Sequence, residues 1–360
     1  MKQTPLHDIH VAAKATMVDF AGWSMPVSYA GTVSEVQAVR TKTGIFDVSH
    51  MGEFRIVGPD AFNLVQSITT NDVSRLQPGE AQYSLLLTEE AGVVDDIIVY
   101  CLAPDSFLIV VNAGCLQKDW VWFEKHAGNF PDSALVDESD LTSLIAIQGP
   151  DAVRIGSLVL GNEFTDLQRF QFALGRYNNV PITVSRTGYT GEDGFEIFCE
   201  NRVAEQLWNA LVKEGAVPAG LGARDVLRLE AAYPLYGHEL DADHSPWESG
   251  TGWAVKLKKG DFTGKRQAEI RRQQNLNKLV GITMNAKAIP REGCIVLDAN
   301  SESEIGTVTS GTFSPTLQQG IAMARVSIDR AAPGTDVVVD IRGRKLAATV
   351  VTLPFYRNGV

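Results

Sequence analysis

Residues 93–101 read Val-Val-Asp-Asp-Ile-Ile-Val-Tyr-Cys, an apolar run in which two carboxylates stand side by side. Similar runs occur at residues 81–87 and 106–112. Residues 88–92 and 102–105 between them have the length and the turn residues of hairpin connections. We therefore predict a three-stranded antiparallel meander. Because side chains alternate between the faces of a strand, one face is predicted to carry Tyr83, Leu85, Leu87, Asp96, Ile98, Tyr100, Leu108, Val110 and Asn112.

That face combines a carboxylate, an amide and two phenols with an apolar wall, which is the composition of a small-molecule pocket. Asp95 and Asp96 point to opposite faces, so only one of them can enter the apolar side. There an ionised carboxylate needs partners or has its pKa raised, as in a general acid that works near neutral pH. The local sequence favours a simpler interpretation, in which both carboxylates lie at an irregular strand start and bond to loop amides.

At 360 residues, the chain is longer than a single ordinary core requires, and we predict two or three domains. Its composition, 44% hydrophobic and 21% charged residues, is that of a soluble globular protein. No apolar run has the length of a membrane span, and the first residues lack the apolar core of a signal peptide. The four cysteines are widely spaced without a Cys-x-x-Cys motif, so we expect reduced thiols and a cytoplasmic protein.

Charge is distributed unevenly along the chain. Residues 251–360 carry 16 Lys and Arg against 9 Asp and Glu, a net charge of +7. Because the whole chain has a net charge of −11, residues 1–250 have a net charge of −18. So acidic a protein is a poor nucleic-acid binder. The basic C-terminal part either attracts an acidic partner or simply attracts the acidic remainder of the chain, and the sequence supports both interpretations equally.

Two stretches resemble one another. Residues 54–62, Phe-Arg-Ile-Val-Gly-Pro-Asp-Ala-Phe, match residues 145–153, Ile-Ala-Ile-Gln-Gly-Pro-Asp-Ala-Val, and each predicts a strand, a turn and an amphipathic helix. We therefore predict paired, interleaved α+β subdomains within residues 1–275, the second of which contains the meander at about residues 54–140. Further helices are predicted at residues 32–43, 203–213, 225–232 and 265–274.

The pattern changes to short alternating runs near residue 279. Gly, Pro and Asn separate these runs, which predicts a small closed or sandwich-like all-β domain over residues 279–360 with its boundary near residues 275–278. The predicted strands are residues 279–284, 305–309, 320–326, 336–341 and 346–353.

Several motifs weigh against other chemistries. Residues 186–194, Arg-Thr-Gly-Tyr-Thr-Gly-Glu-Asp-Gly, lack the ending of a phosphate-binding loop and carry acids that would repel phosphate. Residues 220–225 lack the third glycine of a dinucleotide fingerprint, and the histidines miss the spacing of zinc sites. We therefore expect no metal, flavin or nucleotide. Glu196 is a lone charge in the apolar strand that follows residue 194, either exposed at a sheet edge or serving as a pocket carboxylate.

Six stretches, in the same order along the chain, resemble the aminomethyltransferases, the T-proteins of the glycine cleavage system. Because they extend from one end to the other, the resemblance covers essentially the whole chain. They are residues 17–23 (Met-Val-Asp-Phe-Ala-Gly-Trp), 44–52 (Gly-Ile-Phe-Asp-Val-Ser-His-Met-Gly), 92–96 (Gly-Val-Val-Asp-Asp), 186–192 (Arg-Thr-Gly-Tyr-Thr-Gly-Glu), 220–231 (Gly-Leu-Gly-Ala-Arg-Asp, later Arg-Leu-Glu-Ala) and 309–317 (Thr-Ser-Gly-Thr-Phe-Ser-Pro-Thr-Leu).

The resemblance implies a multi-domain α+β fold, a folate-binding cloverleaf of paired α+β subdomains with a C-terminal β-barrel domain. It implies an enzyme that binds tetrahydrofolate in a central hole and takes the aminomethyl group carried by the lipoyl arm of the H-protein. The products would be 5,10-methylenetetrahydrofolate, ammonia and dihydrolipoyl H-protein. Folate and lipoylated H-protein are the implied partners, without nucleic acid or membrane.

By position, the resemblance implies that Asp96 is the essential carboxylate near the reacting folate nitrogen, contrary to the simpler local interpretation. A pterin presents a ring N–H beside an amino group, a donor pair that the Glu196 carboxylate can accept, and Arg224 suits the carboxylates of a glutamyl tail. The residues that the resemblance assigns to the folate pocket are Met51, Tyr83, Tyr100, Asn112, Tyr189, Glu196, Arg224 and, near the C-terminus, Arg357.

Two positions depart from the residues usual in the family. Ala91 precedes Gly92 where two glycines are more usual, and Gln318 with Gln319 occupies a place where glycine is common. Both departures concern local turn geometry.

Two alternatives stay open. The first is another tetrahydrofolate-dependent enzyme of the same fold, such as a demethylase; the sarcosine- and dimethylglycine-oxidising relatives add a flavin domain whose glycine fingerprint is absent here. The second is a non-enzymatic folate-binding factor for iron–sulfur assembly. Those relatives carry Lys-Gly-Cys-x-x-Gly-Gln, whereas residues 260–265 here read Gly-Asp-Phe-Thr-Gly-Lys without a cysteine.

Overall fold

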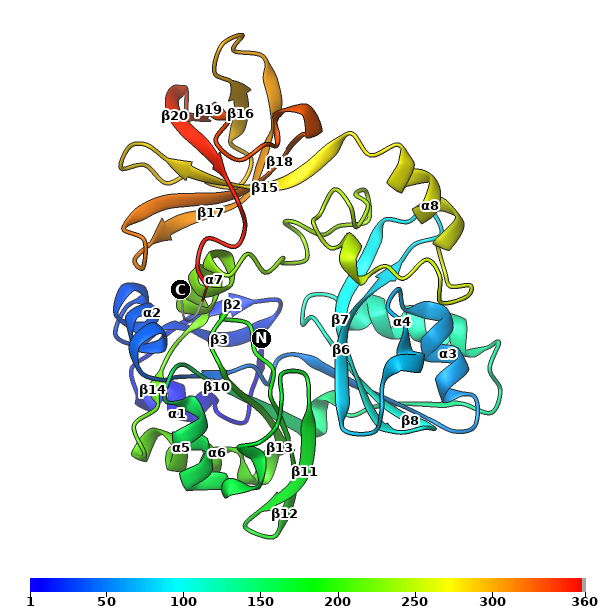
Figure 1. The fold of residues 1–360 in the computed structure, drawn as a ribbon. Helices are drawn as coiled ribbons and strands as arrows, with labels where there is room; N and C mark the ends of the chain where they lie inside the picture. Colours follow the sequence, from blue (N-terminus) through cyan, green and yellow to red (C-terminus); the bar gives the residue numbers. More distant parts are fainter. Residues whose placement is uncertain (358–360) are drawn as a thin grey trace. The chain divides into compact units, whose positions relative to one another are not determined.

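Strand pairing in the computed structural model, which describes residues 1–357, produces three open sheets and one closed barrel (Figure 1). Contacts divide the chain into two compact units. The first unit contains residues 1–68, 72–84 and 97–224, and the second contains residues 69–71, 85–96 and 225 onward. The mixed α+β fold with a C-terminal barrel is therefore confirmed.

The predicted meander is present. β6 (Glu80–Leu87), β7 (Val93–Ala103) and β8 (Ser106–Val111) are neighbours in a five-stranded sheet of order β6-β7-β8-β5-β9, completed by β5 (Gly52–Val57) and β9 (Ala134–Asp137). Helix α3 (Ala61–Ile68) contacts β8, and α4 (Leu116–Ala127) contacts β9. Their apolar stripes cover one face of this sheet, as expected for amphipathic helices.

The register of β7 and β8 confirms the part of the predicted face that these two strands carry. Tyr100 of β7 pairs with Leu108 of β8, and Ile98 pairs with Val110. These side chains share one face, because directly paired residues of neighbouring strands point the same way. Phe54 of β5 belongs to the other face, where its ring packs edge-on against a Phe and a Trp of α4.

The second open sheet of the first unit has six strands, in the order β11-β12-β13-β10-β4-β14. Two helices, α5 (Ala152–Leu160) and α6 (Asn201–Lys213), contact its strands β10 and β13 and bury the apolar core around Trp208. The strands are β11 (Phe172–Tyr177), β12 (Val180–Ser185), β13 (Gly194–Glu200), β10 (Thr142–Gln148), β4 (Gly44–Asp47) and β14 (Val217–Pro218). A three-stranded sheet joins β1 (Lys2–Gln3), β3 (Trp23–Ser28) and β2 (Thr16–Phe20), and α1 (His7–Ala12) contacts β3.

The internal repeat is confirmed as a repeated strand–turn–helix joint. β5 leads into α3, and β10 leads into α5. The turn glycines Gly58 and Gly149 have φ angles of +117° and +137°, a backbone conformation that side chains disfavour. A Cβ on Gly149 would also lie 2.4 Å from the carbonyl oxygen of Lys42, so this joint requires glycine.

The other predicted helices are also present. They are α2 (Thr32–Thr41), α6, α7 (Leu221–Glu230) and α8 (Lys265–Gln273). Helix α7 begins four residues before the predicted start at residue 225, because Gly222 lies within the helix and packs closely instead of forming a loop. A Cβ on Gly222 would lie 2.7 Å from the Thr32 hydroxyl.

The C-terminal barrel closes in the order β15-β18-β17-β16-β19-β20. Its strands are β15 (Asn277–Met284), β16 (Ile295–Asp298), β17 (Glu304–Ser314), β18 (Gln319–Ser327), β19 (Asp336–Ile341) and β20 (Arg344–Val351). Inward-facing aliphatic side chains such as Ile282, Val308 and Val339 fill the interior. The sequence pattern missed β16, because four residues are too few for an alternating run to be recognised.

Two of the family-like stretches hold α7 and the barrel together within the second unit. The buried guanidinium of Arg228 bonds to Glu239 and to the Ser310 hydroxyl, each at 2.9 Å. The Glu230 carboxylate accepts the hydroxyl of Ser314 at 2.5 Å and that of Thr316 at 3.0 Å. These residues therefore have a structural role, since buried charges must be paired and hydrogen-bonded.

Both departures from the usual family residues fall on left-handed backbone. Ala91 has φ +64° and Gln318 has φ +55°. A glycine adopts such angles without the cost that a Cβ adds. Gly92 itself cannot change, because a Cβ there would lie 1.6 Å from the carbonyl oxygen of Ala242.

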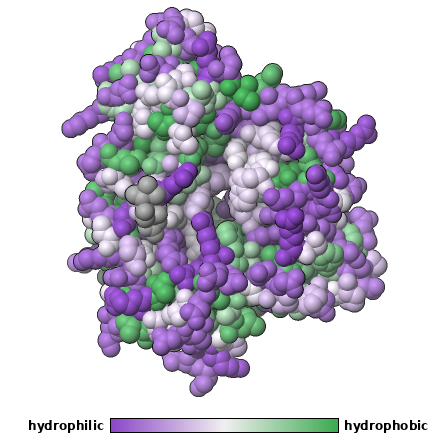
Figure 2. Space-filling model, viewed as in Figure 1, coloured by the Kyte–Doolittle hydropathy of each residue, from purple (hydrophilic) through white to green (hydrophobic). Residues whose placement is uncertain are grey.

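The surface is mixed in character. On the face shown in Figure 2, hydrophobic side chains form scattered patches among hydrophilic ones, and exposed apolar residues such as Leu141, Leu174 and Leu276 lie far apart in the sequence. Among the described residues, no helix combines the length and the apolar character needed to cross a membrane.

Glu53 is an uncompensated acid in the core of the first unit. It pairs with Val110 in the sheet, is fully buried, and neither carboxylate oxygen has a hydrogen-bond partner within residues 1–357. Burial raises the pKa of Glu53 well above its ordinary value, and the negative charges of Asp137 and Glu138 add to the effect. The folded protein therefore keeps this proton at pH values where an exposed glutamate has lost it.

We expect Glu53→Gln to reduce the loss of stability at alkaline pH. The unfolded chain releases the Glu53 proton near the ordinary pKa of about 4.3, whereas the folded chain retains it. The wild type therefore loses stability as pH rises from that value to the folded pKa, by up to about 1.4 kcal/mol per pH unit. Urea unfolding should show a gain for the variant that is larger at pH 8 than at pH 5. A gain independent of pH would contradict a protonated Glu53, and exposed Glu124→Gln is the control.

Candidate functional site

The residues that the sequence assigned to a folate pocket divide between the two units. The second unit contains Asp96 and Arg357. The first contains the other seven, Met51, Tyr83, Tyr100, Asn112, Tyr189, Glu196 and Arg224, and brings several of them together.

Glu196 lies in the interior of the six-stranded sheet. On β13 it pairs with Ala146 on one side and Ser185 on the other, so the edge-exposed alternative is wrong. Its half-buried carboxylate accepts the Thr187 hydroxyl at 2.5 Å. An acceptor-only group in such a place retains further lone pairs for a ligand donor.

Tyr100 continues this polar chain. Its hydroxyl lies 3.4 Å from the Thr187 hydroxyl, and its ring packs edge-on against Phe172 and Phe198. Burial raises the pKa of Tyr100, and the negative charge of Glu196 raises it further. The phenol therefore stays protonated and can donate or accept a hydrogen bond.

Arg224 and Tyr189 form a second pair. The guanidinium carbon lies 4.7 Å from the centre of the Tyr189 ring, a cation–π contact. Burial lowers the pKa of Arg224, while Glu196 and Tyr189 oppose that change. Within residues 1–357 the guanidinium makes no hydrogen bond, so its planar set of donors is available to an anionic ligand.

Ion pairs hold the loop that carries Tyr189. Arg40 of α2 bonds to the Glu192 carboxylate and to the Thr190 carbonyl, each at 2.8 Å. Arg186 forms a two-pronged ion pair with Asp193, with distances of 2.8 and 2.6 Å. Glu192 and Asp193, the acids that would repel a phosphate, therefore hold the loop in place through these ion pairs.

Three other predicted residues lie on turns and strands of the first unit. Met51 is half-buried in the turn after β4, where its N–H donates to the Val48 carbonyl at 3.1 Å. Asn112 follows β8 and is half-buried, as is Tyr83 on β6. Gly114 of the Asn112 loop approaches the β2–β3 turn: a Cβ built there would lie 4.0 Å from that of Ala21.

The sequence interpretation missed His50, which adjoins Met51. Its side chain is 3% exposed, and its ring packs edge-on against Phe20 with 5.5 Å between the ring centres. Burial lowers the pKa of His50 to about 4, and Arg224 contributes against the opposite effect of Asp47. The sequence did offer one signal for His50: it lies within residues 44–52, one of the stretches that resemble the family.

In the second unit, both members of the Asp pair lie inside β7. Asp95 is fully buried and Asp96 is half-buried, so the interpretation as an irregular strand start is wrong. The backbone here is fixed by the Val93 N–H, which donates to the Asp241 carbonyl at 2.8 Å. Asp96 shares a strand face with Ile98 and Tyr100, as predicted. Arg357 is exposed at the end of the described chain.

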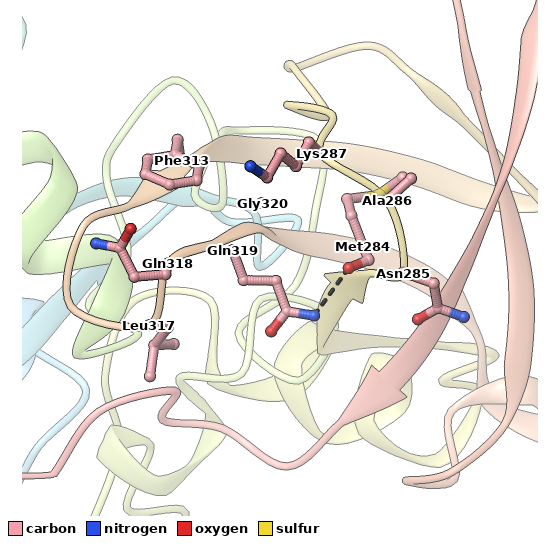
Figure 3. Close-up of a pocket in the computed structure, with 9 residues that line it drawn as sticks. All are labelled: Met284, Asn285, Ala286, Lys287, Phe313, Leu317, Gln318, Gln319 and Gly320. Carbon is pink, nitrogen blue, oxygen red and sulfur yellow. Dashed lines mark hydrogen bonds between the residues drawn. The ribbon is translucent and has the colours of Figure 1, made fainter.

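A hollow of about 250 Å³ lies on the barrel, where the end of β15 meets the β17–β18 hairpin (Figure 3). The Gln319 amide donates to the Met284 carbonyl at 2.8 Å on its wall, and Lys287 and Phe313 project beside it. None of the predicted folate residues lines it, so this hollow is distinct from the candidate site.

Comparison with known proteins shows the family to which the chain belongs. Residues 6–259 match the GCVT N-terminal domain model, and residues 277–357 match the model of the glycine cleavage T-protein C-terminal barrel domain. The chain belongs to the aminomethyltransferase family of glycine cleavage T-proteins.

Relatives of the T-protein family match over nearly their full lengths. Aminomethyltransferases of Symbiobacterium thermophilum and Bdellovibrio bacteriovorus are each 46% identical, over 99% of this chain and 98% and 99% of their own. The crystal structure of glycine cleavage system aminomethyltransferase T from Bartonella henselae superposes with a TM-score of 0.93 at 34% identity, covering 99% of this chain and 98% of that one.

We expect Glu196→Gln to weaken tetrahydrofolate binding more than it slows turnover at saturation. The amide places a donor where the wild-type carboxylate offers only acceptors, at a cost of about 1–3 kcal/mol. Calorimetry with tetrahydrofolate measures the effect, and Glu205→Gln on the exposed face of α6 is the control. Unchanged affinity would remove Glu196 from the folate site.

Proposed function

We propose that the chain transfers the methylene of aminomethyl-lipoyl H-protein to tetrahydrofolate, giving 5,10-methylenetetrahydrofolate, ammonia and dihydrolipoyl H-protein. The observation that carries the proposal is the assembly in the first unit of the Arg224 guanidinium, which has no hydrogen bond within residues 1–357 and lies on the Tyr189 ring, with the Glu196 carboxylate and the Tyr100 phenol. Its donors and acceptors complement a ligand that has both carboxylates and an N–H pair.

Each group has a proposed role. Glu196 accepts the donor pair of the pterin, and Arg224 binds a carboxylate of the glutamyl tail. Tyr83, Tyr100 and Tyr189 offer aromatic faces for the flat rings. The proposed site also includes Met51, Asn112 and, near the C-terminus, Arg357.

Asp96 is the proposed catalytic carboxylate. As the aminomethyl group transfers, positive charge develops on an iminium-like carbon–nitrogen unit, and a proton must reach the departing amine. A carboxylate beside folate N5 stabilises that charge and handles the proton.

The defining experiment is formation of 5,10-methylenetetrahydrofolate from tetrahydrofolate and aminomethylated H-protein. Product formation that requires both substrates supports the proposal. Folate binding without turnover would favour the non-enzymatic alternative. Turnover of a methylated small molecule, without any response to H-protein, would favour a demethylase.

We expect Asp96→Asn to lower turnover by about 10²–10⁴-fold, the usual contribution of a general acid–base group, while the fold is retained. The half-buried amide keeps the shape and one acceptor. Asp95→Asn is the matched comparison, because the fully buried neighbour on the other face should affect the free energy of unfolding first. Turnover rates at saturating folate distinguish the two carboxylates. A stably folded Asp95→Asn with low turnover, together with an active Asp96→Asn, would overturn the assignment.

The basic C-terminal part is the proposed attraction for an acidic, lipoyl-bearing partner. Lys258 and Lys287 are exposed, and Lys287 borders the hollow on the barrel. Lys259, which follows Lys258 in the basic C-terminal part, is unsuitable for such a role, because its ammonium group donates to the carbonyls of Thr69 and Asn71.

We expect the double reversal Lys258→Glu with Lys287→Glu to raise the Michaelis constant for H-protein several-fold without changing that for folate. Long-range attraction between exposed charges is screened over about 8 Å at physiological salt, so the difference from wild type should shrink as salt rises. Reversal of Lys345, which pairs with Glu302 on the barrel surface, is the control. Kinetics that respond neither to salt nor to the double reversal would favour attraction between parts of the chain itself.

A further inference from the structure

Two buried histidines of the first unit differ in one respect. His10 is fully buried, and both of its ring nitrogens are satisfied: Nε2 lies 2.9 Å from the Asp47 carboxylate and Nδ1 lies 2.8 Å from the Tyr29 hydroxyl. His50 is almost as deeply buried, yet neither of its ring nitrogens has a hydrogen bond within residues 1–357. A buried polar group without a partner is uncommon and requires an explanation.

The two nitrogens of His50 are not equivalent. Nδ1 is fully enclosed by protein atoms and has no hydrogen-bond partner within residues 1–357, whereas Nε2 is not fully enclosed. Of the two ring nitrogens, Nε2 is therefore the one that a ligand can reach. The ring is held by its edge-on contact with Phe20, at an interplanar angle of 86°, so its orientation is defined before any ligand arrives.

The surroundings of His50 connect the parts of the candidate site. Arg224 is close enough to lower its pKa, and Arg224 in turn stacks on Tyr189. On its other side, Phe20 precedes Ala21, which the Asn112 loop approaches. His50 therefore lies between two groups of residues that we propose for the folate site.

We propose that His50 is a further folate-binding residue whose Nε2 hydrogen-bonds to a neutral polar group of the bound tetrahydrofolate. This inference rests on the proposed function. A neutral imidazole has one donor and one acceptor, so it complements an amide, a hydroxyl or a ring nitrogen, and leaves the ligand's carboxylates to Arg224.

Three substitutions separate this role from packing. His50→Phe keeps a ring against Phe20 but removes both nitrogens. His50→Gln places a polar group near the position of Nε2, and His50→Asn places one near Nδ1. Each variant is measured for its tetrahydrofolate Kd by calorimetry, its melting temperature, and its kcat and KM with aminomethylated H-protein.

We expect His50→Phe to raise the Kd about 3- to 10-fold, as for one lost hydrogen bond, with kcat at saturating folate within about twofold of wild type. His50→Gln should restore most of the affinity, and His50→Asn should not. A wild-type Kd in His50→Phe, or rescue by Asn rather than Gln, would overturn the proposal. If the Phe variant fails to fold, the ranking of Gln over Asn decides alone.

The Glu196→Gln variant keeps this test separate from the proposed function. If wild type binds tetrahydrofolate and Glu196→Gln weakens it while His50→Phe does not, only the role of His50 is wrong. If wild type itself shows no tetrahydrofolate binding, the proposed function fails as well.

Discussion

The hydrogen bond between Thr187 and Glu196 is the interaction on which the candidate site depends. Glu196 occupies an interior strand of a six-stranded sheet, where an ionised carboxylate is costly unless it is compensated. The hydroxyl that compensates this charge belongs to Thr187, in the loop between β12 and β13. This loop must therefore fold back over the sheet from which it leaves. The same hydroxyl lies 3.4 Å from that of Tyr100, so this contact links the six-stranded sheet to the five-stranded sheet.

The loop geometry follows from that requirement. The Gln148 side chain supports the turn by donating to the Thr187 carbonyl and by accepting the Thr190 hydroxyl. It packs so closely that a Cβ on Gly188 would lie 1.9 Å from its amide oxygen. The ion pairs of Arg40 and Arg186 then fix the rest of the loop. Rigid support of this kind reduces the ordering that a ligand would otherwise have to impose.

Much of this arrangement could be predicted from the sequence. Alternation located the meander and the phase of Asp96, because a period of two survives without knowledge of the neighbouring strands. The family resemblance, rather than local pattern, points to Glu196 and Arg224 as folate-binding residues, and that role stays a prediction. The alternative of an exposed edge could be rejected only by the pairing of β13 on both sides.

Two buried groups without hydrogen-bond partners within residues 1–357, His50 and Glu53, could not be predicted from the sequence. His10 and His50 look alike in the sequence, and only the three-dimensional neighbours show that one is satisfied and the other is not. Glu53 resembles an ordinary strand residue until its burial is known. Short β16 and the early start of α7 were missed for a simpler reason, since too few residues define a period and glycine in a helix is read as a break.

The protonation states of the first unit give the proposed folate site one charged partner and several neutral ones. Burial keeps Tyr100 protonated and His50 neutral near pH 7, whereas Arg224 stays charged because an arginine does not lose its proton in this range. An anionic group of a ligand can therefore pair with Arg224, and its neutral donors and acceptors can hydrogen-bond to uncharged groups such as Tyr100 and His50. A ligand with charge at one end and a flat, uncharged ring system at the other matches this division, and a ligand with evenly spread charge does not.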